Sequence, residues 1–198
     1  MFLDVDIDLD KVPLSDIAFL LPQSMSAKGV AQGKVHAAIG LDDLTAMNLE
    51  KGHFTGQLQL KQLDFQMDSM SVLLEQPELT FTLPNPAPSH KTVDWVDAHL
   101  NFNELTYKQI GTLMAHTYAG RLDAEAGNVL SANPVLYAAA HLQTEDVLMV
   151  EMDSLSALVE NPDLTAYAEY DTKDTTHIPV LQANLTFDDL SGNYIDIV

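Results

Sequence analysis

The chain has 198 residues, of which 46% are hydrophobic, so it can form at least one domain with a core and is not generally disordered. Its 29 acidic residues against nine Lys and Arg give a formal net charge of -20. Nucleic acids and anionic membrane surfaces are bound through clustered basic residues, so this balance argues against both as partners. The chain has no cysteine, which excludes disulfides and thiolate metal sites.

The first predicted element is the stretch LDVDIDLDKVP at residues 3–13, in which aspartates alternate with apolar residues. Strict alternation predicts a strand with one apolar face and one wet face. A calcium loop of the helix–loop–helix type needs Gly at its sixth position and Glu at its twelfth. Counted from Asp4, those positions hold Leu9 and Ser15. We therefore interpret the carboxylate row as the solvated face of a strand and not as a cation site.

The same alternation continues along most of the chain and predicts further strands. It is present at residues 35–41, 58–60, 63–67, 79–83, 98–102, 148–152 and 183–187. The apolar parity changes at Lys61 and Gln62, as it would across a β-bulge or a tight turn. Buried parallel strands would read as continuous apolar runs, so the alternation favours an antiparallel sheet with one wet face.

Two segments have the apolar spacing of short helices. Residues 13–22 have Ser15 as a possible N-cap and end at Pro22, and residues 105–116 have Thr106 as a possible cap. The fold class we predict is mainly β with a few short helices, built as a repetitive, antiparallel, amphipathic sheet that is curved or groove-like.

An internal repeat is the most specific pattern in the chain. The segment MDSMSVLLEQPELT at 67–80 recurs as MDSLSALVENPDLT at 152–165, an offset of 85 residues with nine of 14 positions identical. The same offset aligns AHLNFNELT at 98–106 with ANLTFDDLS at 183–191. We therefore expect one β-rich domain over residues 1–198, with repeats at approximately 58–113 and 143–198 and a partial related unit at 1–57.

Residues that could carry chemistry form no recognisable constellation. The seven histidines are scattered, and none has the spacing of a zinc motif. Asp-Ser-x-Ser is present twice, at Asp68 and Asp153, but without the glycines that present a serine nucleophile. We interpret both copies as a polar strand start or turn, and we expect no catalytic residue, no metal site and no cofactor.

A family resemblance rests on the order of short motifs. The segment LSDIAFLLP is followed by AKGVAQGKVHAAIGLDDL, which supplies Leu21, Pro22, Gly29, Gly33, Val35, Ala37 and Ile39 in succession. This succession resembles the AsmA-type envelope proteins of Gram-negative bacteria and their TamB-like relatives. The stretch LDFQMDSMSVLLEQPELTFTLP is similar to the strand-rich units of that family.

The resemblance implies a long, curved sheet whose concave apolar face shields the acyl chains of lipids. It also implies a periplasmic protein that takes part in outer-membrane biogenesis and is anchored in the inner membrane through segments outside this chain, which would be part of a longer protein. Its partners would be a phospholipid or another acyl-chain lipid, and other envelope proteins. The groove candidates are Leu58, Leu60, Phe65, Leu79, Phe81, Leu100 and Phe102.

Two other hypotheses stay open at this point. The alternating residues could be the core of a closed β scaffold that mediates protein contacts in the periplasm. The chain could also be an enzyme, for example a carbohydrate hydrolase, although no sequence feature supports this.

Overall fold

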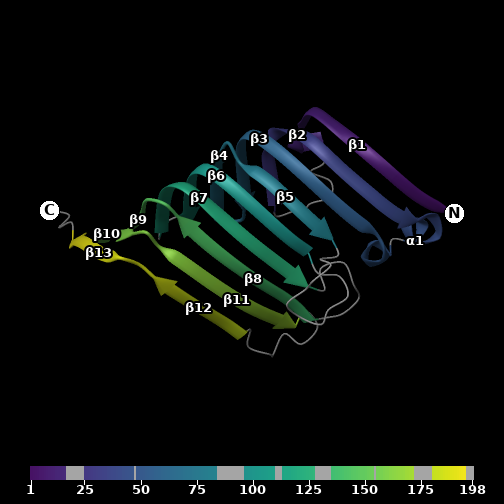
Figure 1. Cartoon of the computed structure of the whole chain (residues 1–198). Coiled ribbons are helices and arrows are strands. Elements are labelled where there is room, and N and C mark those ends of the chain that lie inside the picture. Colours follow the sequence, from purple (N-terminus) through teal and green to yellow (C-terminus); the bar gives the residue numbers. More distant parts are fainter. Residues whose placement is uncertain are drawn as a thin grey trace.

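The computed structural model describes residues 1–16, 25–46, 48–83, 96–109, 113–127, 135–153, 155–171 and 180–194, and most of them are in strands. The described strands form one antiparallel sheet of 13 strands, shown in Figure 1. They are β1 (Phe2–Pro13), β2 (Met25–Gly40), β3 (His53–Met67), β4 (Met70–Glu75), β5 (Glu78–Leu83), β6 (Val96–Gln109), β7 (Leu113–Gly127), β8 (Val135–Thr144), β9 (Val147–Met152), β10 (Leu155–Glu160), β11 (Asp163–Asp171), β12 (Val180–Thr186) and β13 (Asp189–Tyr194). The predicted antiparallel sheet is therefore confirmed.

Several of these strands are two halves of one longer strand. Both β4 and β5 pair with β3 on one side and with β6 on the other, at different ends. In the same way β8 and β9 lie end to end and both pair with β7. On their other side β8 pairs with β11 and β9 pairs with β10, so β10 and β11 also lie end to end. The last position holds β12, which pairs with β11, and β13, which pairs with β10. If two strands that lie end to end are counted as one position, the sheet is nine positions wide. The strand β1 lies at one edge, and β12 and β13 lie at the other.

The long strands are interrupted near their middle. Between β4 and β5, Gln76 has a φ of 50°, and the N–H groups of Gln76 and Leu60 donate to the carbonyls of Lys61 and Pro77 at 2.9 and 3.0 Å. Asn161 interrupts the strand β10–β11 with a φ of 48°.

Lys11 in β1 and Ala119 in β7 also have positive φ values, of 53° and 38°. Hydrogen bonds connect the interruptions across neighbouring positions, since Asn103 of β6 donates to Gln76 and the N–H of Glu145 donates to the carbonyl of Ala119. Together they form one line across the sheet, which we call the kink line.

The change of parity at Lys61 and Gln62 is part of this line. In the ladder between β2 and β3, Gly29 faces Leu63 and Ala31 faces Leu60, so two residues of β3 oppose one of β2. This is a β-bulge, as predicted. Because the bulge adds one residue, the apolar side chains before and after it stay on the same side of the sheet.

Buried side chains show which way the sheet bends at the kink line. Leu74, Phe102, Thr117 and Val159 are all buried, and Phe102 is only 4% exposed. Each lies next to the kink line on the apolar face, where a flat single layer would leave it partly exposed. The apolar face is therefore the inside of the bend. In Figure 1 the long strands arch at this line, and their other halves pass behind the near ones.

One predicted helix is wrong. Residues 105–109 belong to β6 and residues 113–116 belong to β7, while 110–112 lie outside the described part of the chain. Thr106 lies within a strand instead of capping a helix. The helical spacing of the apolar residues is overridden by pairing, since Leu105 faces Thr117 and Tyr107 faces Ala115 across the two strands. Tertiary contacts of this kind outweigh a weak local preference.

The other predicted helix, at residues 13–22, is described only in part. Residues 14–16 form a 3-10 turn after β1, and residues 17–22 lie outside the described part of the chain. The helices that are described in full follow β2 and were not predicted: α1 (Leu41–Thr45) and the 3-10 helix η2 (Leu49–Lys51). They are tied together by the ion pair between Lys51 and Asp43, at 3.1 Å.

The first residues of the two Asp-Ser-x-Ser segments have the same backbone conformation. Asp68 and Asp153 both have a φ of 49°, each directly after a strand and before a paired one. The strand interruptions that follow are also bridged alike, because Asn103 Nδ2 donates to Gln76 Oε1 and Asn161 Nδ2 donates to the carboxylate of Asp188, both at 2.8 Å. The predicted turn is confirmed at Asp68, while repetition of whole 85-residue units stays a prediction.

Candidate functional site

The inner face of the bent sheet carries a row of leucines that crosses all nine positions. Cross-strand partners in an antiparallel sheet point to the same side, so the row can be followed from ladder to ladder. It consists of Leu9, Gly33, Leu58, Leu79, Leu100, Leu122, Leu142, Leu164 and Leu185. At about 4.8 Å between strands, eight steps span roughly 38 Å. The inner face is thus one continuous apolar strip.

The next row changes in character from one edge to the other. It consists of Ile7, Val35, Gly56, Phe81, Ala98, Ala124, Ala140, Ala166 and Ala183. At the β3–β5 end Phe81 fills the space above Gly56, where an added Cβ would lie 2.2 Å from the ring. From β6 to β12 the row holds only alanines, which leave the floor unfilled.

A hollow of about 330 Å³ lies over these alanines. Its lining is almost entirely apolar and includes Val96, Ala98, Ala124, Ala126, Ala138, Ala140, Ala166, Ala168 and Leu181. An apolar cavity of about 150 Å³ is enough to hold a benzene molecule, so this hollow has room for a larger hydrocarbon group.

All seven sequence-predicted groove residues lie on the inner face. Leu58, Leu79 and Leu100 are neighbours in the leucine row, and Phe81 is in the row beside it. The other three follow the same parity: Leu60 faces Ala31, Phe65 faces Val72, and Phe102 faces Gly120. Phe102 is buried at the kink line, so it supports the bend more than it offers surface. That these residues bind lipid stays a prediction.

Much of the inner face is accessible to solvent. Few apolar side chains of the described residues are buried, and apart from Ile39 these lie close to the kink line. Towards the β12 edge the face is most open, with Leu181 73% exposed. Within the described ranges, no second sheet packs on this face. A large uncovered apolar surface of this kind usually marks a binding surface.

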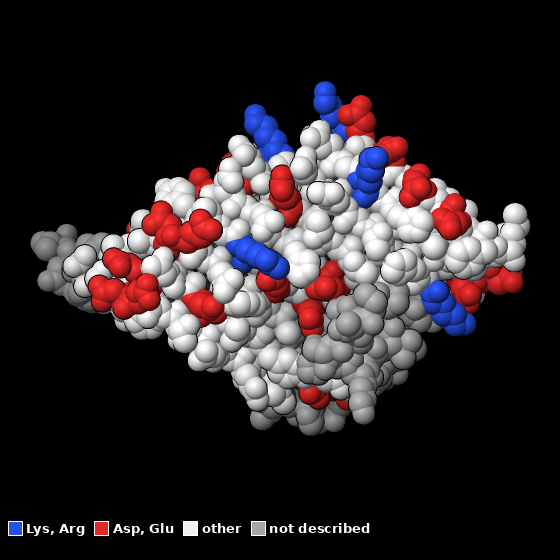
Figure 2. Space-filling model, viewed as in Figure 1, with Lys and Arg blue, Asp and Glu red and all other residues white. Residues whose placement is uncertain are grey.

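The outer face carries acidic side chains on several strands, and Figure 2 shows Asp and Glu scattered over the visible surface with a few Lys and Arg among them. A row of acidic side chains follows β1, where the side chains of Asp4, Asp6 and Asp8 are largely exposed. Their contacts are with β2: His36 Nδ1 lies 2.9 Å from Asp6, and Lys34 Nζ lies 3.7 Å from Asp8. The predicted wet strand face is confirmed. Among the described residues, no group of His, Asp and Glu has the geometry of a metal site.

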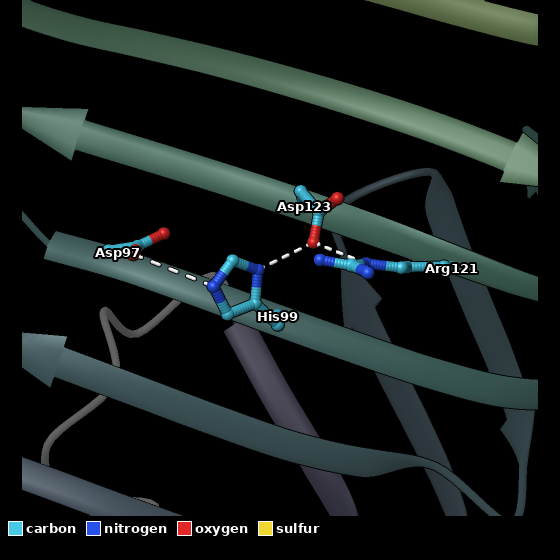
Figure 3. A network of polar contacts seen from close by, with 4 residues as sticks. All are labelled: Asp97, His99, Arg121 and Asp123. Carbon is cyan, nitrogen blue, oxygen red and sulfur yellow. Dashed lines mark hydrogen bonds and ion pairs between the residues drawn. The ribbon is translucent and has the colours of Figure 1, made fainter. Parts of the chain in front are cut away.

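A second polar network links β6 and β7 (Figure 3). His99 Nδ1 and Arg121 Nε both donate to Asp123 Oδ1, at 2.5 and 2.7 Å, and His99 Nε2 lies 3.5 Å from Asp97. Partial burial by itself would raise the pKa of Asp123. The hydrogen bonds and positive charges of Arg121 and His99 outweigh it, so the pKa of Asp123 lies below its ordinary value.

A similar pair links β8 and β11 on the same face. Asp163 accepts hydrogen bonds from Gln143 and His141, both at 2.9 Å, and these bonds lower its pKa. His141 and His99 lie in strands, as the sequence predicted. Each of these groups joins neighbouring strands on a solvated face, so their arrangement stabilises strand pairing.

Sequence reasoning missed the alanine hollow, and it predicted the kink line only at the bulge of Lys61 and Gln62. The alanines of AAAHL at 138–142 and of TAYAE at 165–169 were visible in the sequence, but only the ladders bring the two runs together. The kink at Asn161 was signalled by Asn-Pro, and the kink at Gln76 by Gln-Pro, because proline lacks the N–H that a regular ladder needs.

Comparison of the chain with known protein families, with curated proteins and with solved structures gives no match. In the described part of the chain no helix is long and apolar enough to cross a membrane.

Proposed function

We propose that this chain is a lipid-shielding module of an AsmA-like envelope protein that takes part in outer-membrane biogenesis. Acyl chains lie against the inner face of the bent sheet while the outer acidic face stays in water. The module performs no chemistry, and it works in the periplasm as part of a protein anchored in the inner membrane.

The observation that carries the proposal is the apolar strip across nine sheet positions, on which no second sheet packs among the residues that the structure describes. A protein of ordinary solubility would bury such a strip under a second layer, because each exposed CH₂ costs about 0.8 kcal/mol relative to burial. Here 13 strands are in a single sheet, and the inner face has a hollow of about 330 Å³ with an apolar lining. Hydrocarbon chains match this apolar lining in chemistry.

The order of motifs supports the assignment to the AsmA-like family. That family is expected to have a curved, single-layered sheet, and the chain folds as one. The kink line accounts for the curvature, since the bulge of β3 and the interruptions at Gln76 and Asn161 fall on the same line across the sheet.

The first experiment is native mass spectrometry of the protein after gentle extraction. We expect co-purified acyl-chain lipid, which is lost on treatment with detergent. Protein that never carries lipid, under any gentle condition, contradicts the proposal and leaves a scaffold for protein contacts as the better account.

The second experiment uses a fluorescent fatty acid and two matched variants. Ala166 lines the hollow, and its neighbour Thr165 points to the outer face, where it is exposed. Ala166→Phe should reduce binding by about tenfold by filling the hollow, and Thr165→Phe should leave it unchanged. Equal binding by both variants would count against the inner face as the site.

A further inference from the structure

We infer that two copies of this chain associate through the free edge of β12, so that their inner faces join into one continuous apolar surface. The inference goes beyond the proposed function and does not depend on it, because it rests on strand pairing at the edges of the sheet. Three observations carry it: the composition of the two edges, the direction of the edge strands, and the pattern of side chains on β12.

The two edges of the sheet differ in how they are protected. An edge strand has unpaired N–H and C=O groups, to which another strand can add unless charges, prolines or bulges prevent it. The β1 edge has all three: a row of aspartates, a shift of register between Leu9 and Val12, and a proline as its last residue. The strand β12, with the sequence VLQANLT, has no charge and no proline, and all seven of its residues are exposed. Among the described residues, no strand pairs with its free side.

The direction of the edge strands decides which arrangement of copies preserves the sheet. Eight antiparallel ladders separate β1 from β12 (Figure 1), so the two edge strands run in the same direction. Copies stacked head to tail would therefore pair β12 in parallel with β1, or would turn the apolar face of one copy to the polar side of the next. Neither result continues an antiparallel sheet with one apolar face.

A twofold axis normal to the sheet avoids both problems. It pairs β12 with β12 of the second copy in antiparallel fashion, and it keeps both inner faces on the same side. The same axis placed at the other edge would bring the aspartates of β1 opposite one another, and like charges in directly opposite positions destabilise a strand pair. The β12 edge is therefore the one at which a second copy fits.

The side chains of β12 are complementary to themselves about Ala183. When Ala183 lies on the axis, Leu181 faces Leu185 of the second copy on the inner side. These two leucines are 73% and 42% exposed in the single chain, and pairing brings each against an apolar partner. On the outer side Gln182 faces Asn184 of the second copy, and two amide groups can donate to one another.

The pairing extends the inner face. Nine positions from each copy give eighteen, or roughly 80 Å at the usual strand spacing. The lining of the alanine hollow includes Leu181 of β12, so the two hollows lie on either side of the axis. The interface consists of one short strand from each copy, which is small for a protein interface, so we expect a weak dimer that forms with rising concentration.

The test of the register uses the absence of native cysteine. Directly opposite residues of an antiparallel pair have Cα atoms about 4.5 to 5.5 Å apart, which is within the range of a disulfide. Ala183→Cys should therefore give a disulfide-linked dimer under mild oxidation. The control is Gln182→Cys on the same exposed strand. Its counterpart in the second copy is diagonal to it, at about 7 to 8 Å, so we expect about tenfold less cross-linked dimer.

Two double variants test the same register without a cross-link, by sedimentation velocity over a range of concentrations. The mass of the wild type should rise from one chain towards two. Gln182→Lys with Asn184→Lys places ammonium groups opposite one another on both sides of the axis, and it should keep the protein monomeric. Gln182→Lys with Asn184→Asp places opposite charges at the same points, and it should restore the dimer.

The outcomes decide the inference without reference to lipid. A wild type that is monomeric at every concentration, open polymers in place of a dimer, or equal cross-linking at 182 and 183 overturns it. Double variants that behave alike overturn it as well, because association would then use another surface, such as the inner faces themselves. A dimer with cross-linking at 183 and the expected response of both double variants supports it.

Discussion

The two ends of the inner face have the same backbone arrangement but differ in how it is filled. At the β3–β5 end, Phe81 lies over Gly56 and the strip is packed flush. At the β7–β12 end, the same row holds alanines and a hollow lies over them. The contrast teaches that the sheet does not need large side chains on this face for its own pairing. Because strand pairing does not depend on the size of these side chains, small residues in this row can leave a cavity.

The largest expected effect concerns the support of the bend. Phe102 is 4% exposed at the kink line, whereas Phe187, its counterpart 85 residues later, is 43% exposed near the open edge. Phe102→Ala should lower the free energy of unfolding by about 3 to 5 kcal/mol, because it leaves a cavity that both halves of the sheet line. Phe187→Ala should cost only about 1 kcal/mol. Urea denaturation of both variants measures the difference, and similar losses would show that the bend is not packed around Phe102.

The next effect tests the filled end itself. Gly56→Ala places a Cβ 2.2 Å from the ring of Phe81. The ring has to move, and we expect a loss of about 1 to 3 kcal/mol from overpacking. The control is Gly192→Ala at the open edge, where the nearest atom to the new Cβ is the Ser156 carbonyl oxygen at 3.3 Å. If thermal unfolding finds the two glycines equally tolerant, the filled end is not packed flush.

At the hollow end, a larger side chain should lower ligand binding and leave stability almost unchanged. Ala140→Leu adds apolar volume where space exists, so stability should change by less than about 1 kcal/mol. Fatty-acid binding should weaken by about fourfold for each methylene group of the ligand that is displaced, from 0.8 kcal/mol per CH₂. Unchanged binding, measured by fluorescence titration, would mean that the ligand does not use the hollow.

The smallest effect concerns the outer face. The pKa of Asp123 is lower in the folded chain than in the unfolded chain, so its contribution to stability is present above the unfolded pKa and is lost as pH falls through the folded pKa. Asp123→Asn should cost at most about 1 kcal/mol at pH 7, because the pair is partly exposed. The difference from the wild type should close as pH falls below about 4.

The control for this pH series is Asp10→Asn, at an exposed position of β1. Its stability difference from the wild type at pH 7 should be small, because this position is exposed to solvent. A difference for Asp123→Asn that persists unchanged down to pH 2 would mean that the network with His99 and Arg121 does not stabilise the fold.

Alternation was sufficient to predict the sheet and the face to which each of the seven groove candidates points, because period two is set by the strand backbone itself. It was not sufficient at residues 105–116, where Leu105 and Tyr107 have helical spacing but pair with β7. The hollow could not be predicted, because it depends on alanines of β6, β7, β8, β11 and β12 that only the registers bring together.

The most direct test of the central claim uses two adjacent alanines and the absence of native cysteine. Ala140 points to the inner face and Ala139 to the outer face of β8. Each is replaced by cysteine in turn and labelled with an environment-sensitive dye, and acyl-chain lipid is then added. We predict a blue shift of the emission for the label at 140 and no shift for the label at 139. Equal shifts at both positions, or none at 140, would contradict a lipid-sheltering inner face.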